Sequence, residues 1–301
     1  MPSCMLYKQS DSRNNTPMLI IKSDGTQEPF DTEKLRSSLL GAGAAEDTVA
    51  DIIAHVEAEI TDGATTRDIY RHAFDLLKNK EKPVALKYSL KRAVMELGPS
   101  GFPFEKFVAE IFRQRGYIAE TGRIVKGHCV EHEIDVVAWN DDELFMVEAK
   151  FHNDPGMKSD LKVALYVKAR ADDVGQMTFE YGGKERKLSQ FWLVTNTKFS
   201  TAAIQYGSCQ GSLRMVGWSY PMGRQRGERG NEQLENLHDM IVKAKLHPVT
   251  CLTTIDGHAK KALLDQGLVL CKSLVDNPGA LLLAGVKQEA MPAVWEEIEM
   301  L

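Results

Sequence analysis

The sequence predicts an α/β protein in which an α/β sandwich is preceded by a mainly α domain and followed by a small helical domain. Three observations support this prediction. The chain of 301 residues is longer than the roughly 100–150 residues of a typical single domain. Helical and strand patterns alternate between residues 104 and 218, which is typical of a sandwich with a largely buried sheet. Residues 231–301 show helical patterns without a convincing strand pattern.

The first domain is expected over residues 18–98. Residues 1–17 are polar and without apolar periodicity, which predicts a flexible leader. The strands MLIIK and QEPF, joined through an Asp-Gly turn, form a small hairpin, after which Asp31 caps a helix. Thr65 and Asp68 form a capping box, and Pro83 suits the first turn of a helix. Helical patterns cover residues 33–41, 46–60, 66–79 and 84–97.

The second domain is expected over residues 99–222, because LGPSGFP at 97–103 concentrates Gly and Pro and marks a boundary. Its helices are expected at 104–115, 158–173 and 200–208. Its strands are expected near 117–123, 132–140, 143–151, 191–195 and 213–218. The Gly- and Arg-rich loop PMGRQRGERGN then leads to the helical unit of residues 231–301.

Composition narrows the class of protein. No apolar stretch reaches the roughly 18 residues of a membrane span and the N-terminus lacks a signal core, so we expect a cytoplasmic protein without membrane contact. Five scattered cysteines without a CxxC pair argue against disulfides and a zinc ribbon. At a net charge of −5, contact with nucleic acid needs local basic clusters, although solvated surface is the first interpretation of each cluster taken alone. The candidates are Lys158, Lys162, Lys168 and Arg170; Lys184, Arg186 and Lys187; and Arg224, Arg226 and Arg229.

The stretch EHEIDVVAWNDDELFMVEAKF carries the strongest chemical signal. If Asp141 and Asp142 form a two-residue hairpin loop, residues whose numbers sum to 283 face one another, so Asp135 lies opposite Glu148. Opposed residues share a face with Cβ atoms about 5 Å apart, which lets two carboxylates grip one hard cation. A loop of three to five residues would shift this register.

Strand alternation adds Lys150 and Glu133 to the same face. Two close carboxylates in an apolar setting have a raised proton affinity unless a cation compensates them. A divalent metal would do so, and it would also polarise a phosphate and activate water, while the amine of Lys150 stabilises developing charge. The alternative interpretation is an internal salt bridge among Asp135, Glu148 and Lys150.

The order of a helix (PFEKFVAEIFRQRGY), a strand, a strand with Asp135, a strand ending VEAK, a helix and the strand FWLVTNTKFS resembles the PD-(D/E)xK nuclease superfamily, particularly its Mrr-like restriction-endonuclease branch. The resemblance covers about residues 100–218. It implies that Asp135 and Glu148 bind Mg²⁺ (or Mn²⁺), that the backbone carbonyl of Ala149 is a further ligand and that Lys150 is catalytic. The chain departs from the family at two places. The segment before the acidic residue, which is Gly-rich in the family, is GHCVEHEID here, and Phe151 follows the motif lysine where a polar or basic residue is common.

Two groups near this motif have competing interpretations. Glu105 or Glu110 on the preceding helix could add an acidic group to the site, but a solvated helix face is the expectation. His128, Cys129 and His132 could bind zinc, yet zinc usually needs four ligands and alternation sends Cys129 and His132 to opposite faces. His132 could instead contact a phosphate.

The segment IIKSDGTQEPFDTEKL with four helices ending PVALKYSLKRAV resembles an ATP-cone, a nucleotide-sensing module, over about residues 18–98. The resemblance implies regulation by ATP or dATP and assembly into a homo-oligomer through the cone. Lys22 and Lys34 could hold phosphates with the amides at a helix N-terminus, and Tyr88 and Arg92 match the terminal helix of the family. Ser23 replaces one basic residue of the usual pair, and a cone that has lost its nucleotide is the alternative.

In the C-terminal segment, LLDQGLV at 263–269 and LLLAGVK at 281–287 resemble helix-hairpin-helix turns, which approach DNA backbones through exposed amides. Leu-rich helices that end at Gly are the alternative interpretation.

The sequence thus predicts a Mg²⁺-dependent DNA endonuclease of the restriction or DNA-processing type, regulated by ATP or dATP. The alternative is a nucleotide-sensing, DNA-binding regulator whose nuclease fold does not cut, and a third reading is a scaffold protein.

Overall fold

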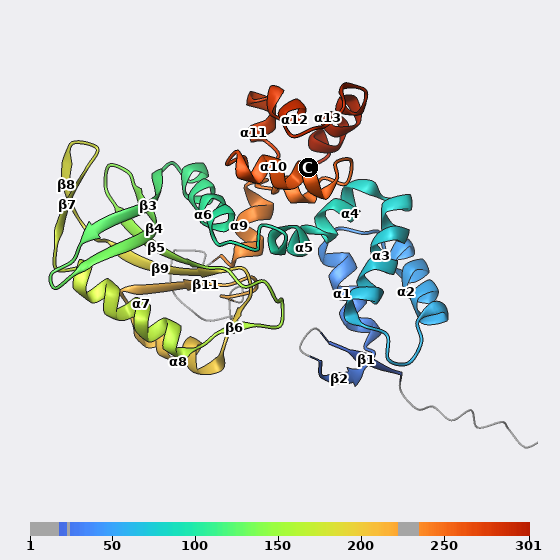
Figure 1. Cartoon of the computed structure of the whole chain (residues 1–301). Helices are drawn as coiled ribbons and strands as arrows, with labels where there is room; N and C mark the ends of the chain where they lie inside the picture. The colour runs from blue at the N-terminus through green and yellow to red at the C-terminus, as the bar shows by residue number, and fades with distance from the viewer. Residues whose placement is uncertain (1–17, 23–24, 222–234) are drawn as a thin grey trace, which may run out of the picture. The chain divides into compact units, whose positions relative to one another are not determined.

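The computed structural model describes residues 18–22, 25–221 and 235–301. The leader expected at 1–17 and the arginine cluster at 224–229 lie outside the described residues. The chain divides into two compact units, residues 1–76 and 77–301. Figure 1 labels the helices and strands of both units.

The first unit contains the expected hairpin and helices. Strands β1 (Leu19–Ile21) and β2 (Gln27–Pro29) pair antiparallel. Asp31 caps the first helix by accepting the Glu33 N–H. The capping box is also present, because Thr65 Oγ1 accepts the Asp68 N–H at 3.1 Å and Asp68 accepts the Thr65 N–H at 3.3 Å. The helices are α1 (Thr32–Gly41), α2 (Glu46–Glu59) and α3 (Thr66–Lys80), which continues past the division.

The helix expected over 84–97 is interrupted. It forms α4 (Lys82–Tyr88) and α5 (Leu90–Met95), separated at Ser89. The Ser89 hydroxyl donates to the Leu86 carbonyl at 2.8 Å, a bond that competes with regular helix geometry. The single helix of the sequence analysis was therefore wrong at this position.

A five-stranded sheet in the order β11-β9-β5-β4-β3 forms the centre of the second unit. β3, β4 and β5 pair antiparallel, whereas β5, β9 and β11 pair parallel. These strands are Ile118–Lys126 (β3), Glu131–Trp139 (β4), Leu144–Lys150 (β5), Gln190–Thr195 (β9) and Leu213–Val216 (β11). This mixed α/β architecture with flanking helices confirms the predicted fold class.

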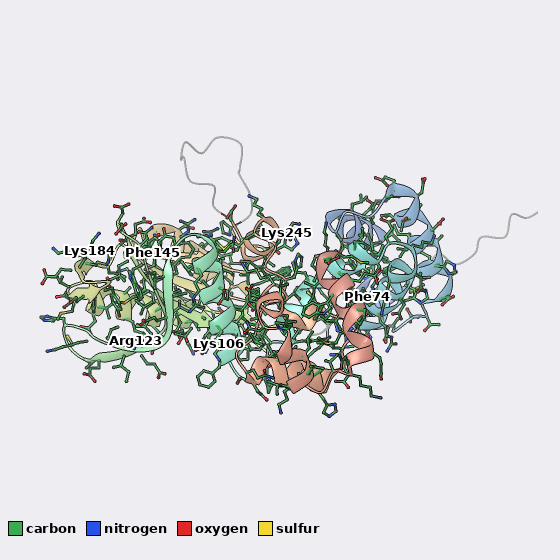
Figure 2. All side chains as sticks on the ribbon, turned by 90° about the horizontal axis from the view of Figure 1, so that it is seen from above. Phe74, Lys106, Arg123, Phe145, Lys184 and Lys245 are labelled. Atoms are coloured by element: carbon green, nitrogen blue, oxygen red, sulfur yellow. The ribbon has the colours of Figure 1, made fainter. Side chains whose placement is uncertain are left out.

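Helices cover both faces of the sheet. Figure 1 shows α6 (Phe102–Gln114) on one side and α7 (Leu161–Val174) with α8 (Thr201–Cys209) on the other. Phe145 of β5, labelled in Figure 2, packs against Phe112 of α6 and Trp192 of β9. On the opposite face, Met146 and Leu193 are buried with Val167 of α7.

Four short strands were missing from the sequence analysis. β6 (Lys158–Ser159) pairs parallel with β10 (Lys198–Phe199), and α7 therefore begins only after Asp160, which caps it. β7 (Thr178–Tyr181) and β8 (Lys184–Lys187) form a hairpin whose loop, Gly182-Gly183, has φ of 63° and 72°. A two-residue loop with two positive φ angles favours glycine, so the Gly-Gly pair was a readable signal.

The C-terminal segment from residue 235 is helical as expected, with one isolated bridge between Pro248 and Leu270 in its described part. Its helices share a core with α5 and α6. At both predicted glycine turns, the helix ends at a glycine in the left-handed backbone conformation, with φ of 81° at Gly267 and 86° at Gly285. The helices are α9 (Leu237–Lys243), α10 (Gly257–Asp265), α11 (Ser273–Asp276), α12 (Gly279–Leu283) and α13 (Met291–Glu299), with 3₁₀ turns at Val249–Cys251 and Gln288–Ala290.

Within the described ranges, every helix is too short or too polar to cross a lipid bilayer.

Candidate active site

β4 and β5 pair in the register that a two-residue loop requires. Val136 faces Val147 and Trp139 faces Leu144, so partner numbers sum to 283. The Asn140 N–H donates to the Glu143 carbonyl at 3.1 Å and closes the loop. One step beyond the last pair, the same register sets Asp135 opposite Glu148.

Where β4 and β5 separate, the Asp135 side chain takes the place of a backbone carbonyl as hydrogen-bond acceptor. Its carboxylate accepts the Ala149 N–H at 2.7 Å, just past the end of the regular β4–β5 pairing. The N–H and C=O of one strand residue point toward the same neighbour, so the Ala149 carbonyl also faces the Asp135 side rather than β9. A carboxylate oxygen of Asp135 and the carbonyl oxygen of Ala149 are thus both on the side of β5 that faces β4.

Glu148 is held by a residue that the sequence analysis placed in a surface cluster. Arg170 of α7 donates one nitrogen to the Glu148 carboxylate and another to the Glu133 carbonyl. Arg170 is only 7% exposed, so this is a buried contact and the solvated interpretation of Arg170 was wrong. The proposed internal salt bridge takes a different form, because the partner of Glu148 is Arg170 and not Lys150.

Burial raises the pKa of both carboxyls. For Asp135, the largest cause is burial, which the Ala149 N–H and the Arg170 charge partly offset. For Glu148, burial is again the largest cause, followed by repulsion from Asp135. Among the residues that the structure describes, Asp135 and Glu148 each use one carboxylate oxygen in a hydrogen bond, and the other oxygen has no protein donor.

Lys150 ends β5 on the face of Glu148, two residues beyond it. Its side chain is exposed and makes no ion pair within the described part of the chain. Burial of the His152 ring, and then the charge of Lys150, lower the pKa of His152. The amine is therefore accessible to an anion that approaches the strand end.

Glu105 joins the acidic group from the other side of the sheet. Burial, and then repulsion from Asp135, Glu133 and Glu148, raise the pKa of Glu105 to about 7. The expectation of a solvated helix face was wrong for this residue, whereas Glu110 does pair with Arg113 at 2.5 Å. Glu133 itself is exposed at the margin of the group.

The His128, Cys129 and His132 cluster is organised by one carboxylate. Asp173, near the end of α7, accepts from the Cys129 N–H at 2.7 Å and lies 2.7 Å from His132 Nε2. These bonds lower the pKa of Asp173. His132 thus ties β4 to α7.

Unpaired lysines lie close to the same strand ends. Lys158 of β6 and Lys198 of β10 are direct partners in a parallel ladder, and both are exposed. Burial and the charge of Lys198 lower the pKa of Lys91 on α5. Three like charges are gathered without an ion pair to an acid in the described residues, which favours an anionic ligand.

The four residues assigned to nucleotide fall in different units. In the first unit, Lys22 and Lys34 converge on Glu28, at 3.1 and 3.2 Å. The two lysines hold the pKa of Glu28 below its usual value. In the second unit, Tyr88 ends α4, and Arg92 of α5 donates to Glu96 at 2.8 Å.

Comparison with known proteins gives matches along the chain. The model of the ATP cone domain matches residues 18–95, that of the restriction endonuclease catalytic domain of Mrr type matches residues 99–216, and that of the AF1548-like C-terminal domain matches residues 247–301. An uncharacterized protein of Archaeoglobus fulgidus is 38% identical over 168 residues, which are 56% of this chain and 83% of the relative. The crystal structure of AF1548, a protein of unknown function, superposes with a TM-score of 0.51 and 34% identity over 66% of this chain and 97% of that one.

An ATP cone ahead of a restriction endonuclease domain indicates a nuclease under nucleotide control. The sequence identity is 38% with the first relative and 34% with AF1548, and it extends over most of the length of each. Identity of this extent establishes common descent. The chain belongs to the AF1548-like family of restriction endonuclease-fold proteins and carries an ATP cone domain at its N-terminus.

Proposed function

We propose that this protein is a Mg²⁺- or Mn²⁺-dependent DNA endonuclease whose activity responds to ATP or dATP bound by the cone. One observation carries the proposal: the β4–β5 register, continued one step past its last pair, sets Asp135 opposite Glu148, and strand alternation puts Lys150 on the face of Glu148. Two carboxylates and an amine at a strand end suit the cleavage of a phosphodiester, which needs both a cation and a positive charge near the phosphate.

The donor set fits a hard divalent cation. Asp135 and Glu148 would each contribute the oxygen that no protein group uses, and Ala149 would contribute its carbonyl. The raised pKa of both carboxyls supports the proposal, because a cation is what would compensate their repulsion. When bound, Mg²⁺ supplies Lewis-acid polarisation of the phosphate and lowers the pKa of water.

Four side chains of the protein have the remaining roles in the proposed cleavage. Lys150 contacts a non-bridging phosphate oxygen and stabilises the negative charge that develops there. Arg170 fixes the rotamer of Glu148 before substrate arrives. Glu105, with a pKa near 7, can accept a proton from water at neutral pH, and Glu133 adds negative charge at the margin.

DNA is the proposed substrate because the basic groups near the site suit a long polyanion. Lys158 and Lys198 stand side by side next to Lys91, and such clusters bind phosphates with a strong salt dependence. A DNA strand whose scissile phosphate lies at Lys150 would extend its neighbouring phosphates over this cluster.

Cleavage of plasmid and linear DNA with and without Mg²⁺ tests the proposal. Asp135→Asn and Lys150→Met should abolish cleavage, and Asp135→Asn should also weaken Mn²⁺ binding in calorimetry. Asp142→Asn is the matched control, because it removes an exposed carboxylate from the loop of the same hairpin. Unchanged Mn²⁺ affinity in Asp135→Asn, or cleavage that survives it, would refute the assignment.

For the cone, we infer that ATP or dATP binds near Lys22 and Lys34 of the first unit and promotes assembly into a homo-oligomer. The convergence of two lysines on a single carboxylate leaves a net positive charge, which supports a phosphate ligand. Calorimetry with ATP and dATP on the parent and on Lys34→Ala, paired with light scattering, tests both parts. Equal affinity of parent and variant would contradict the site.

A second candidate function is a nucleotide-sensing, DNA-binding regulator that does not cut. The contact of Arg170 with Glu148 favours it, because the positive charge of an arginine beside a carboxylate repels a metal ion. A preparation that binds DNA but cuts no form of it, whose affinity is unchanged in Asp135→Asn and Lys150→Met, would support the regulator over the nuclease.

A further inference from the structure

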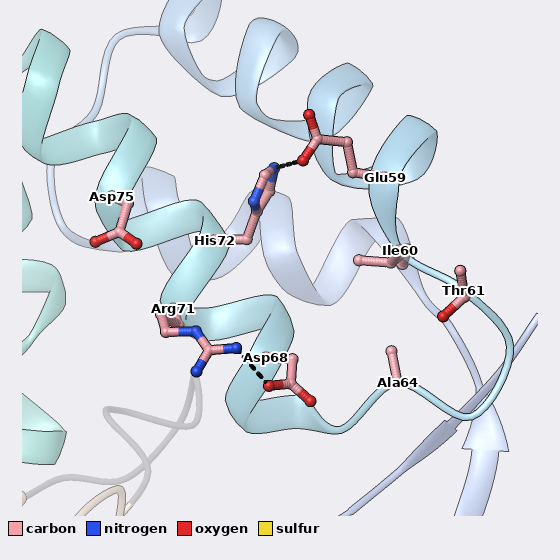
Figure 3. A pocket seen from close by; sticks show the side chains of 8 residues that line it. All are labelled: Glu59, Ile60, Thr61, Ala64, Asp68, Arg71, His72 and Asp75. Atoms are coloured by element: carbon pink, nitrogen blue, oxygen red, sulfur yellow. Dashed lines mark hydrogen bonds and ion pairs between the residues drawn. The ribbon is translucent and has the colours of Figure 1, made fainter.

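Two helices of the first unit bring two imidazoles and a carboxylate together. Among the described residues, one group of three His, Cys, Asp or Glu side chains has ligand atoms that all lie within 4.8 Å of one another: His55, Glu59 and His72. His55 and Glu59 are one turn apart on α2, and His72 reaches them from α3. Figure 3 shows the His72 ring pointing at Glu59, with a dashed line for their ion pair.

The distances within this group are long for hydrogen bonds. His72 Nε2 lies 3.5 Å from one Glu59 oxygen, and His55 Nδ1 lies 3.7 Å from the other. His72 Nε2 is also buried without a hydrogen-bond partner, a situation that normally costs stability. Two ligand atoms that are each about 2.0–2.1 Å from a tetrahedral ion lie about 3.3–3.4 Å apart. The two histidine–glutamate separations are therefore closer to those of ligands around one ion than to hydrogen bonds, and all three ligand atoms lie within 4.8 Å of one another.

We propose that His55, Glu59 and His72 bind one divalent transition-metal ion of the zinc type, which would link α2 to α3 within the first unit. Imidazole nitrogens select zinc, cobalt, nickel or copper over magnesium, because Mg²⁺ prefers oxygen ligands. Three protein ligands leave a coordination position for water or another group. The nuclease site, in contrast, offers only oxygen atoms.

The surroundings leave this open position accessible. A pocket of about 290 Å³ borders the group and is lined by Glu59 and His72 themselves. On its far side, Arg71 pairs with Asp68 at 2.8 Å, and Asp75 lies one turn further along α3 (Figure 3). Asp68 and Asp75 add negative potential beside the proposed cation. His55 and Glu59 are 59% exposed, so both can rotate the short distance that closes the coordination sphere.

Co²⁺ binding to the full-length chain tests the proposal. The experiment uses an Asp135→Asn, Glu148→Gln background, so that the nuclease site does not compete for the ion. Tetrahedral Co²⁺ with nitrogen and oxygen ligands should give visible d–d absorption bands that Zn²⁺ abolishes. His72→Gln and Glu59→Gln should weaken Co²⁺ by more than the roughly 10–100-fold that follows the loss of an outer-shell partner.

Two control variants are matched to these changes. Glu57→Gln removes an exposed carboxylate from the same helix, and His258→Gln removes an exposed imidazole from another helix. Both should leave the Co²⁺ affinity unchanged, and thermal melting without metal should show that all variants fold. Equal affinity in parent, His72→Gln and Glu59→Gln would overturn the proposal. A thiolate-to-cobalt charge-transfer band would also overturn it, because it would assign the ion to cysteine.

Discussion

Replacing Glu105 by Gln tests the electrostatics of the candidate active site. Burial and the charges of Asp135 and its neighbours raise the pKa of Glu105 from 4.5 to about 7. Between these pH values the folded protein keeps a proton that the unfolded chain releases, so the free energy of unfolding falls as the pH rises. At about 1.36 kcal/mol per pKa unit, the full loss above pH 7 is about 3 kcal/mol. Because Glu105 is only half-buried, solvent screening reduces the expected loss to about 1–2 kcal/mol.

The assay is urea unfolding in EDTA at pH 5 and pH 8. The parent should lose about 1–2 kcal/mol more than Glu105→Gln between these pH values, because the variant lacks the titrating group. Glu110→Gln, which removes a carboxylate paired with Arg113 on the same helix, should behave like the parent. Parallel pH profiles for parent and Glu105→Gln would refute the placement of Glu105 among the acids of the site.

Three further substitutions probe other parts of the second unit. Arg170→Met should lower the free energy of unfolding in urea by about 3–5 kcal/mol, because it leaves Glu148 buried without its partner; a loss under about 1 kcal/mol would contradict a buried pair. Burial lowers the pKa of His247 from 6.5 to about 4, so the parent should lose stability as the pH falls through that window, and His247→Leu should lose less; identical acid unfolding curves would argue against this. Glu297→Ala removes the acceptor of four bonds from two neighbouring threonines and should cost about 2–4 kcal/mol in thermal melts. Glu296→Ala, an exposed neighbour, should cost little.

The geometry of the β4–β5 hairpin could be predicted from the sequence because its loop is short. A two-residue loop admits one register, and the pair Asp141-Asp142 between two apolar runs was assumed to form that loop. The positions of Asp135, Glu148 and Lys150 on one face then followed from strand alternation alone. Local bonds set the helix starts in the same way, as at Asp31 and Thr65.

Residues that reach the site from other elements could not be predicted. Arg170 and Glu105 lie on helices that pack on opposite faces of the sheet, and helical periodicity identifies the apolar stripe but not which polar neighbour meets a strand end. The two-residue strands β6 and β10 are too short to show alternation. Ser89 illustrates a third limit, because the hydroxyl that interrupts the helix resembles any other helical serine in the sequence.

The arrangement around Asp135 and Glu148 shows how a fold can hold two repelling acids before a cation arrives. Each carboxylate is fixed through one oxygen, by the Ala149 N–H in one case and by Arg170 in the other. Neither contact removes the cost of burial, since the pKa of both groups stays raised. The fold thus keeps one oxygen of each carboxylate oriented, while the burial of the two negative charges is only partly compensated. The remaining free-energy cost of burial is what a bound cation can recover. Arg170 therefore acts as a positioning residue for Glu148, and a cation and Arg170 can share that carboxylate because they use different oxygens.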